Sequence, residues 1–230
     1  MRWKFLSQKN ILSSIDDKIA VNEIFFSIQG ESIYQGLPCI FIRFSGCNLR
    51  CLWCDTSYSF EEEASIYTID QIIQEIDSFS CPLVEITGGE PLLQKKQLIL
   101  LIQRLLSQNK IVLLETNGSL SLECIPESTI KIVDVKLPGS GEYGSFMLEN
   151  LLFLRHNKDQ LKFVVSCYED LEAAREFVIK NRDSVPQELI ISSVQRDFLR
   201  EAADFILKSG IHFRLQTQLH KIIWNDQRSR

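Results

Sequence analysis

Three cysteines within eight positions are the part of the sequence best suited to chemistry. Cys47, Cys51 and Cys54 lie in the segment FSGCNLRCLWCDTS, residues 44–57, with the spacing C-x3-C-x2-C. The other four cysteines stand singly along the chain, and isolated thiols in a reducing compartment usually behave as small hydrophobic groups. The clustered thiols therefore indicate a metal centre, because thiolates suit soft iron clusters and zinc.

Two kinds of centre are open to three thiols. Structural zinc normally has four ligands in a closed tetrahedron, and here the fourth would be one of the three histidines, none of which is near the cluster in sequence: His156, His212 and His220. An iron–sulfur cube held by three thiolates leaves one iron open to an outside ligand. The spacing favours the cube, and a zinc-stabilised binding module is the non-enzyme alternative.

Further polar motifs end strand-like segments downstream of the cysteines. The segment EITGGEP contains Gly88, Gly89 and Glu90. Paired glycines let a backbone approach a ligand closely, and a carboxylate accepts hydrogen bonds from a ligand ammonium. The segments ETNGS and DVK place Asn117 and Lys136 at the ends of two later runs. Either residue also fits an ordinary solvated loop.

Polar residues that precede the cysteines suit a flat, polar ligand. Gln29 and Glu31 offer an amide and a carboxylate at alternate positions, so that both could reach one side of a ligand. Such a pair matches the donor and acceptor edge of a pterin or guanine ring. Arg43 can bind a carboxylate through two parallel hydrogen bonds. A polar strand end and an ordinary surface arginine are the alternatives.

Alternating strand and helix patterns form the frame that must position these groups. Strands are predicted at residues 22–28, 39–45, 82–87, 110–115, 130–136, 161–166, 188–193 and 211–216, and helices at 68–79, 91–108, 168–181 and 196–210. This alternation predicts an α/β protein with a mostly parallel sheet, either open or curled into a full or partial barrel. In that architecture the loops at the C-terminal ends of the strands carry the chemistry.

Length and charge limit the domain organisation, the partners and the location that fit this sequence. The 230 residues fit one domain, expected at 21–230, with residues 1–20 as an N-terminal appendage. A net charge of -5 argues against a long nucleic-acid footprint. The N-terminus lacks the apolar region of a secretory signal, and no apolar run approaches the roughly 20 residues of a membrane span. We therefore expect a cytoplasmic protein without direct nucleic-acid or membrane partners.

The motifs in their order resemble the 7-carboxy-7-deazaguanine synthase family of the radical S-adenosylmethionine (SAM) superfamily. The matching segments are SIQGES, FIRFSGCNLRCLWCDT, TGGEP, ETNGS, DVK and QLHKIIW, from about Glu23 to Trp224. The resemblance implies a radical SAM partial β/α barrel that converts 6-carboxy-5,6,7,8-tetrahydropterin to 7-carboxy-7-deazaguanine with loss of ammonia, on the route to queuosine and other 7-deazapurines. It also implies a [4Fe-4S] cluster, SAM and Mg2+ as cofactors, an electron donor such as flavodoxin, and a homodimer.

The resemblance implies a role for each matching residue, with the radical coming from SAM rather than from an acid or base of the protein. Cys47, Cys51 and Cys54 would hold the cluster and Thr56 would ligate Mg2+; Trp53, Gly88, Gly89, Glu90, Asn117, Lys136, Ser192 and Gln195 would contact SAM; Ile28, Gln29, Gly30, Glu31, Arg43, Thr87 and His220 would contact the substrate. Thr56 also suits a helix N-cap or turn, and His220 could simply pack at a strand end. Within the superfamily, the alternative is an activase that installs a glycyl radical in a partner enzyme.

Overall fold

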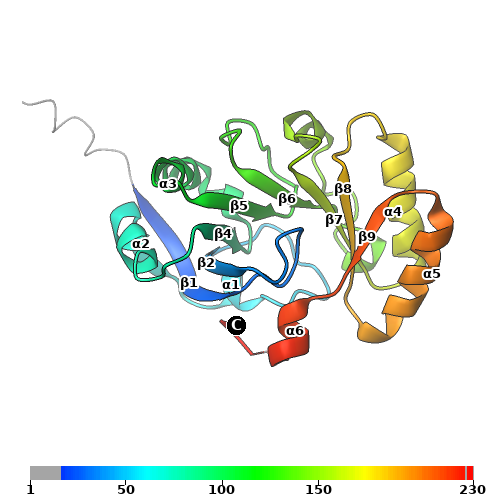
Figure 1. Ribbon diagram of the computed structural model, residues 1–230, viewed down its shortest axis with the longest axis horizontal. Helices are drawn as coiled ribbons and strands as arrows, with labels where there is room; N and C mark the ends of the chain where they lie inside the picture. Colours follow the sequence, from blue (N-terminus) through cyan, green and yellow to red (C-terminus); the bar gives the residue numbers. More distant parts are fainter. Residues whose placement is uncertain (1–16, 226, 230) are drawn as a thin grey trace, which may run out of the picture.

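A nine-stranded sheet organises the part of the chain described by a computed structural model, residues 17–225 and 227–229 (Figure 1). The strand order is β3-β1-β2-β4-β5-β6-β7-β8-β9. Every neighbouring pair from β2 to β9 is parallel, whereas β1 is antiparallel to both β2 and β3. The sheet has ends at β3 and β9 and is not closed, so the predicted partial barrel is confirmed.

The elements have the following bounds. The strands are β1 Lys18–Ile28, β2 Pro38–Phe44, β3 Ser65–Thr68, β4 Leu83–Gly88, β5 Ile111–Thr116, β6 Ile130–Asp134, β7 Gln160–Val165, β8 Glu188–Ser193 and β9 Phe213–Gln216. The α-helices are α1 Tyr58–Glu61, α2 Ile69–Ile76, α3 Lys95–Ser107, α4 Tyr168–Lys180, α5 Leu199–Ser209 and α6 Leu219–Trp224. Short 3-10 helices are η2 Pro91–Gln94, η3 Pro138–Ser140, η4 Leu148–Phe153 and η5 Arg196–Phe198.

Side-chain alternation along the strands separates the core from the cavity side of the sheet. In β4, Val84 and Ile86 are fully buried in the hydrophobic core, while the alternate positions carry Glu85 and Thr87. Helix α3 covers the core through an apolar stripe at i, i+3, i+4 and i+7, namely Leu98, Leu101, Ile102 and Leu105. The outer face of the sheet is thus sealed by helices, and the inner face is left for polar groups.

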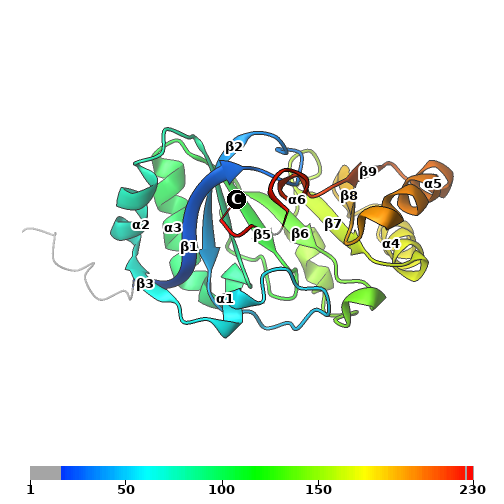
Figure 2. The same cartoon turned by 90° about the horizontal axis from the view of Figure 1, so that it is seen from below.

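The helices divide between the two sides of the sheet. Helices α2 to α5 pack along its outer side, whereas the short α6 lies over the opposite side (Figures 1 and 2). The sequence patterns did not predict α6, α1 or β3. Because α6 follows β9 directly, the chain ends across the side of the sheet that carries the polar groups.

Strand β1 begins earlier than the predicted domain boundary. Lys18 to Val21 pair with β3, so residues 18–20 belong to the sheet rather than to an appendage. The rest of the predicted appendage, residues 1–16, lies outside the described residues, and residue 17 precedes the strand.

A buried ion pair under the sheet provides a test of the fold. Lys131 in β6 and Asp159, which precedes β7, are 2% and 0% exposed and lie 3.2 Å apart. We expect Lys131→Met to lower the free energy of unfolding by about 3–5 kcal/mol, because it leaves a buried carboxylate without its charge partner. Urea unfolding followed by circular dichroism measures this.

A surface pair serves as the control. Arg104 and Asp70 are 3.7 Å apart with side chains 53% and 86% exposed, so Arg104→Met should cost less than about 1 kcal/mol. Equal losses in the two variants would contradict the assignment of Lys131 to the buried framework.

Candidate active site

A cavity at the C-terminal ends of the parallel strands brings most of the predicted site together. Its lining includes every residue predicted for the cluster, for Mg2+ and for the substrate: Cys47, Cys51, Cys54, Thr56, Ile28, Gln29, Gly30, Glu31, Arg43, Thr87 and His220. Of the residues predicted to contact SAM, it includes Trp53, Gly88, Gly89, Asn117 and Lys136. Glu90, Ser192 and Gln195 do not line the cavity, and their contacts with SAM stay predictions.

The three cysteines of the loop after β2 share one end of this cavity. All three are free thiols and partly exposed. Burial raises the pKa values of Cys47 and Cys51, and the nearby thiol of Cys54 raises them further, while Lys136 opposes the rise at Cys51. In the described part of the chain, no three His, Cys, Asp or Glu side chains converge as ligands of one metal ion.

The two glycines at the end of β4 let this strand close against the cysteine loop. A Cβ on Gly88 would collide with the backbone of Phe44, and a Cβ on Gly89 would collide with Gly46 O and lie 2.7 Å from Cys47 Cβ. The N–H of Glu90 donates to Gly46 O at 2.8 Å. The glycines were expected to admit a ligand, and the structure shows that they also admit the loop that carries the cluster ligands.

Glu90 is a buried connector between β4 and β5. Its carboxylate accepts hydrogen bonds from Leu92 N at 2.9 Å, Thr116 Oγ1 at 2.9 Å and Asn117 N at 2.8 Å. Burial raises the pKa of Glu90 to about 7, although these hydrogen bonds oppose the rise. The carboxylate therefore ties the end of β4 to the end of β5.

Unpartnered polar atoms lie beside the cysteines. Lys136 Nζ donates to Asp134 Oδ2 at 2.6 Å and lies 5.1 Å from the centre of the Trp53 ring. Trp53 Nε1 and Asp134 Oδ1 are buried and have no partner among the described residues. A polar cofactor could satisfy both atoms, and their position next to three thiols fits SAM bound against a cluster.

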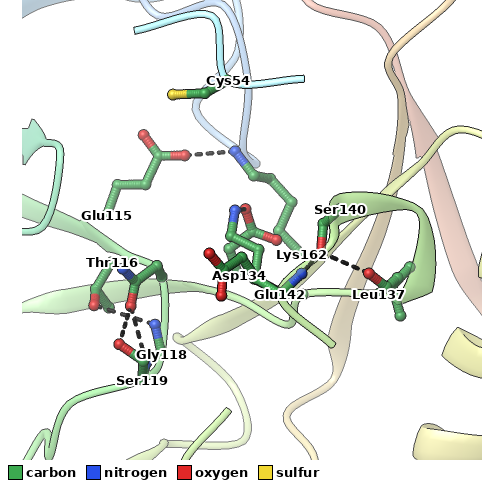
Figure 3. A network of polar contacts seen from close by, with 12 residues as sticks. Cys54, Glu115, Thr116, Gly118, Ser119, Asp134, Leu137, Ser140, Glu142 and Lys162 are labelled. Carbon is green, nitrogen blue, oxygen red and sulfur yellow. Dashed lines mark hydrogen bonds and ion pairs between the residues drawn. The ribbon is translucent and has the colours of Figure 1, made fainter. Parts of the chain in front are cut away.

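Buried charges from three parts of the fold also line the cavity. Lys162 in β7 lies 2.9 Å from Glu31 Oε2 and 2.5 Å from Glu115 Oε1, and Thr87 Oγ1 donates to Glu115 Oε2 at 3.0 Å. Figure 3 shows the Glu115–Lys162 pair below Cys54. Glu85 lies beside this network and is hydrogen-bonded to Gln29.

The protonation of this network follows from its pairing. Burial favours neutral forms, yet Lys162 holds the pKa of Glu115 below its usual range, and Glu115 and Glu31 raise the pKa of Lys162. Burial, with the nearby Glu115 charge, raises the pKa of Glu85 well above its usual range. The cavity thus combines an ion pair with a carboxyl group whose burial favours the protonated form.

Sequence reasoning missed Glu85, Glu115 and Lys162. The available signal was a charged residue in a largely apolar strand: Glu85 in PLVEIT, Glu115 in KIVLLE and Lys162 in LKFVVS. Such a residue must be paired or functional, because an isolated buried charge is costly.

The Gln29 side chain lines the cavity as predicted and is also held by protein partners. It is 3% exposed, its Nε2 donates to Glu85 and its Oε1 accepts from Glu31 N at 2.9 Å. Its amide therefore supports the loop after β1. Gly30 packs against His220, since a Cβ there would meet the imidazole, and Leu219 N donates to Gly30 O at 2.9 Å. The carboxylate of Glu31, paired with Lys162, lines the cavity.

Thr56 lies between the cysteines and the opposite charges. Its Oγ1 is 3.8 Å from Cys54 Sγ, and its neighbour Asp55 pairs with Lys221 at 3.1 Å. Helix α1 has Ser57 as its N-cap, so Thr56 is not a cap. Its hydroxyl lines the cavity, where a cation could meet both the protein and a bound substrate.

The fold and the thiols define a radical SAM enzyme. Residues 41–135 match the family model of the radical SAM superfamily. The structure titled "Crystal structure of QueE from Escherichia coli" aligns with a TM-score of 0.74 at 24% identity, covering 87% of this chain and 94% of that chain, and so has the same fold.

Curated relatives identify the family within this class. The 7-carboxy-7-deazaguanine synthases of Koribacter versatilis and Chlorobaculum tepidum are 40% and 35% identical to the chain, covering 90% and 92% of it and 97% of each relative. The chain belongs to the 7-carboxy-7-deazaguanine synthase family. The resemblance found in the sequence is confirmed, and this family, rather than a glycyl-radical activase or a zinc module, accounts for nearly the whole chain.

The contact between Gly89 and the cysteine loop makes a testable prediction. We expect Gly89→Ala to displace the backbone at Gly46 and Cys47, and therefore to lower the iron bound per chain after anaerobic reconstitution by at least about half, because cluster ligands need exact placement. Iron analysis and the charge-transfer absorbance measure the loss. Gly144→Ala is the control for backbone strain without a clash, since Gly144 has a φ of 83° but a Cβ there meets open space; equal iron in both variants would refute the prediction.

Proposed function

We propose that the chain converts 6-carboxy-5,6,7,8-tetrahydropterin to 7-carboxy-7-deazaguanine, with loss of ammonia, in the cavity described above. The observation that carries the proposal is that one cavity is lined both by three cysteine thiols and by a paired set of donors and acceptors. This arrangement places a radical source beside a surface suited to a flat heterocycle with a carboxylate.

Each end of the cavity has a separate task in this proposal. The thiols of Cys47, Cys51 and Cys54 hold the cluster, and Trp53, Asn117 and Lys136 contact SAM. When bound, the cluster and SAM supply a 5'-deoxyadenosyl radical, which suits abstraction of a hydrogen that no base of ordinary strength would remove. Residues that line the cavity orient the substrate and exclude water.

The substrate end provides groups for both parts of the pterin. The Arg43 guanidinium binds the carboxylate as a fork, while the Thr87 hydroxyl oxygen and the Glu31 carboxylate present acceptors to the ring edge. Burial lowers the pKa of His220, although Glu31 and Asp55 oppose this, so a neutral imidazole is available to donate or accept one hydrogen bond. Together these groups fix which ring carbon faces SAM.

The Thr56 hydroxyl is our proposed protein ligand for Mg2+. Mg2+ usually keeps several waters and few protein ligands, which suits one hydroxyl beside a substrate carboxylate. Thr56→Val removes the hydroxyl but keeps the shape, so we expect it to raise the Mg2+ concentration for half-maximal activity about tenfold. Thr56→Ser, which keeps the hydroxyl, should behave like the parent enzyme. Mg2+ titrations that coincide for all three proteins would refute this role.

The wider setting of the enzyme is also part of the proposal. An electron donor such as flavodoxin would reduce the cluster. The sheet has open edges at β3 and β9, and formation of a homodimer would cover such an edge. We expect the enzyme to act in the cytoplasm without direct nucleic-acid contacts. None of the helices in residues 17–225 and 227–229 is long and apolar enough to span a membrane.

A turnover assay tests the reaction directly. Anaerobically purified protein should be brown, and with SAM, a reductant and 6-carboxytetrahydropterin it should form 7-carboxy-7-deazaguanine. Cys51→Ala should lose the colour and the activity, whereas Cys124→Ala, at an exposed and isolated thiol, should keep both. SAM cleavage without consumption of this pterin would refute the substrate, and zinc in place of iron would refute the cluster.

A further inference from the structure

Glu23 lies at an irregularity of β1 that sets the direction of the Glu23 side chain. The register between β1 and β2 shifts between Val21 and Glu23: Val21 pairs with Phe44, and Glu23 pairs with Arg43. A bulge of this kind changes the direction of the following side chains and is common beside active sites. Directly opposed residues of an antiparallel pair face the same side, so Glu23 and Arg43 meet.

Arg43 is held by one edge of its guanidinium. Its Nε donates to Glu23 Oε1 at 2.7 Å, and the guanidinium carbon lies 5.9 Å from the ring centres of both Phe25 and Tyr58. No residue in the described ranges is hydrogen-bonded to its two Nη atoms, and Arg43 lines the cavity. The two Nη atoms are therefore left for a ligand.

Glu23 is itself fixed from several directions. Oε1 also accepts from the Tyr58 hydroxyl at 2.8 Å, while Oε2 accepts from Ser229 Oγ at 2.6 Å and from Arg228 Nε at 3.4 Å. The side chain is 9% exposed. Burial alone would raise the pKa of Glu23, but the hydrogen bonds from Ser229, Arg43 and Tyr58 outweigh burial and lower it. The Glu23 carboxylate is thus ionised, and hydrogen bonds from residues other than Arg43 hold it in place.

We propose that Glu23 is a positioning residue for substrate recognition: it holds Arg43 by Nε so that both Nη atoms point into the cavity and bind the substrate carboxylate. This inference rests on the proposed function, in which Arg43 receives that carboxylate. Glu23 acts through Arg43 and does not line the cavity. Tyr58 and the C-terminal residues Arg228 and Ser229 secure Glu23 from the other side.

Two conservative variants separate positioning from a general contribution of charge. Glu23→Gln keeps the reach and one acceptor oxygen but removes the charge, whereas Glu23→Asp keeps the charge but withdraws the oxygen by one methylene. If Glu23 acts by holding Nε in place, Glu23→Asp should raise KM for the pterin about tenfold and Glu23→Gln by less than about threefold. The kcat, the SAM affinity and the electron paramagnetic resonance spectrum of the reduced cluster should change little in either variant.

A double-mutant cycle tests whether the effect passes through Arg43. In an Arg43→Ala background, Glu23→Asp should raise KM no further, because the group that it positions is absent. Asp159→Asn is the control for a purely structural role: Asp159 is fully buried and ion-paired but far from the cavity lining. It should lower the melting temperature without changing KM.

The outcomes distinguish this inference from the proposed function. If the parent enzyme does not consume 6-carboxytetrahydropterin, the proposed function fails. If the parent enzyme consumes this pterin, three results would overturn the positioning role. Glu23→Asp would leave KM unchanged, or raise it equally with and without Arg43, or affect KM less than Glu23→Gln does. If one variant is insoluble, the other still tests the positioning role. A ratio of variant to parent KM above about threefold for Glu23→Gln, or near one for Glu23→Asp, contradicts the role.

Discussion

The structure depends on the rule that charges inside a parallel sheet must find partners. The strands of such a sheet are covered by helices on the outer side, so a charged side chain on either face lies where water is scarce. Glu115, Lys162 and Glu31 meet this demand by pairing with one another across the cavity. The same pairing that makes their burial tolerable presents ordered donors and acceptors to a substrate.

The cysteine loop is held in place by groups that are not cluster ligands. Gly46 O accepts the N–H of Glu90, Leu52 N donates to Ser140 O at 2.9 Å, and Arg50 N donates to Glu142 Oε1 at 2.5 Å. The loop is therefore attached to the ends of β4 and β6, the strands that also carry Gly89 and Asp134. Cluster ligands and cofactor contacts consequently share one rigid support, as accurate catalysis requires.

The end of the chain joins the substrate side of the cavity to the first strand. Helix α6 carries His220 into the cavity lining, Lys221 pairs with Asp55, and Arg228 reaches Glu23. The C-terminal segment thus contacts both the residues that follow the cysteines and the strand that anchors Arg43. The substrate end of the site is formed only when the last strand and helix have folded back across the sheet.

The sequence by itself determined the features that depend on local spacing. Three cysteines in eight positions define a loop of soft ligands, and the alternating patterns define a mostly parallel α/β sheet whose strand ends carry the motifs. These features need no knowledge of which strands are neighbours. For the same reason the family resemblance, which rests on the order of short motifs, could be stated before the fold was known.

Only the tertiary structure decided how the polar side chains are used. Glu90 and Gln29 were expected to face ligands, and the structure shows in addition that both are hydrogen-bonded to buried partners from other segments. Lys162 meets Glu31, although 131 positions separate them in the chain. A local pattern reports the direction of a side chain along its own strand, but its partner is set by strand order and register, which form only when the whole sheet assembles.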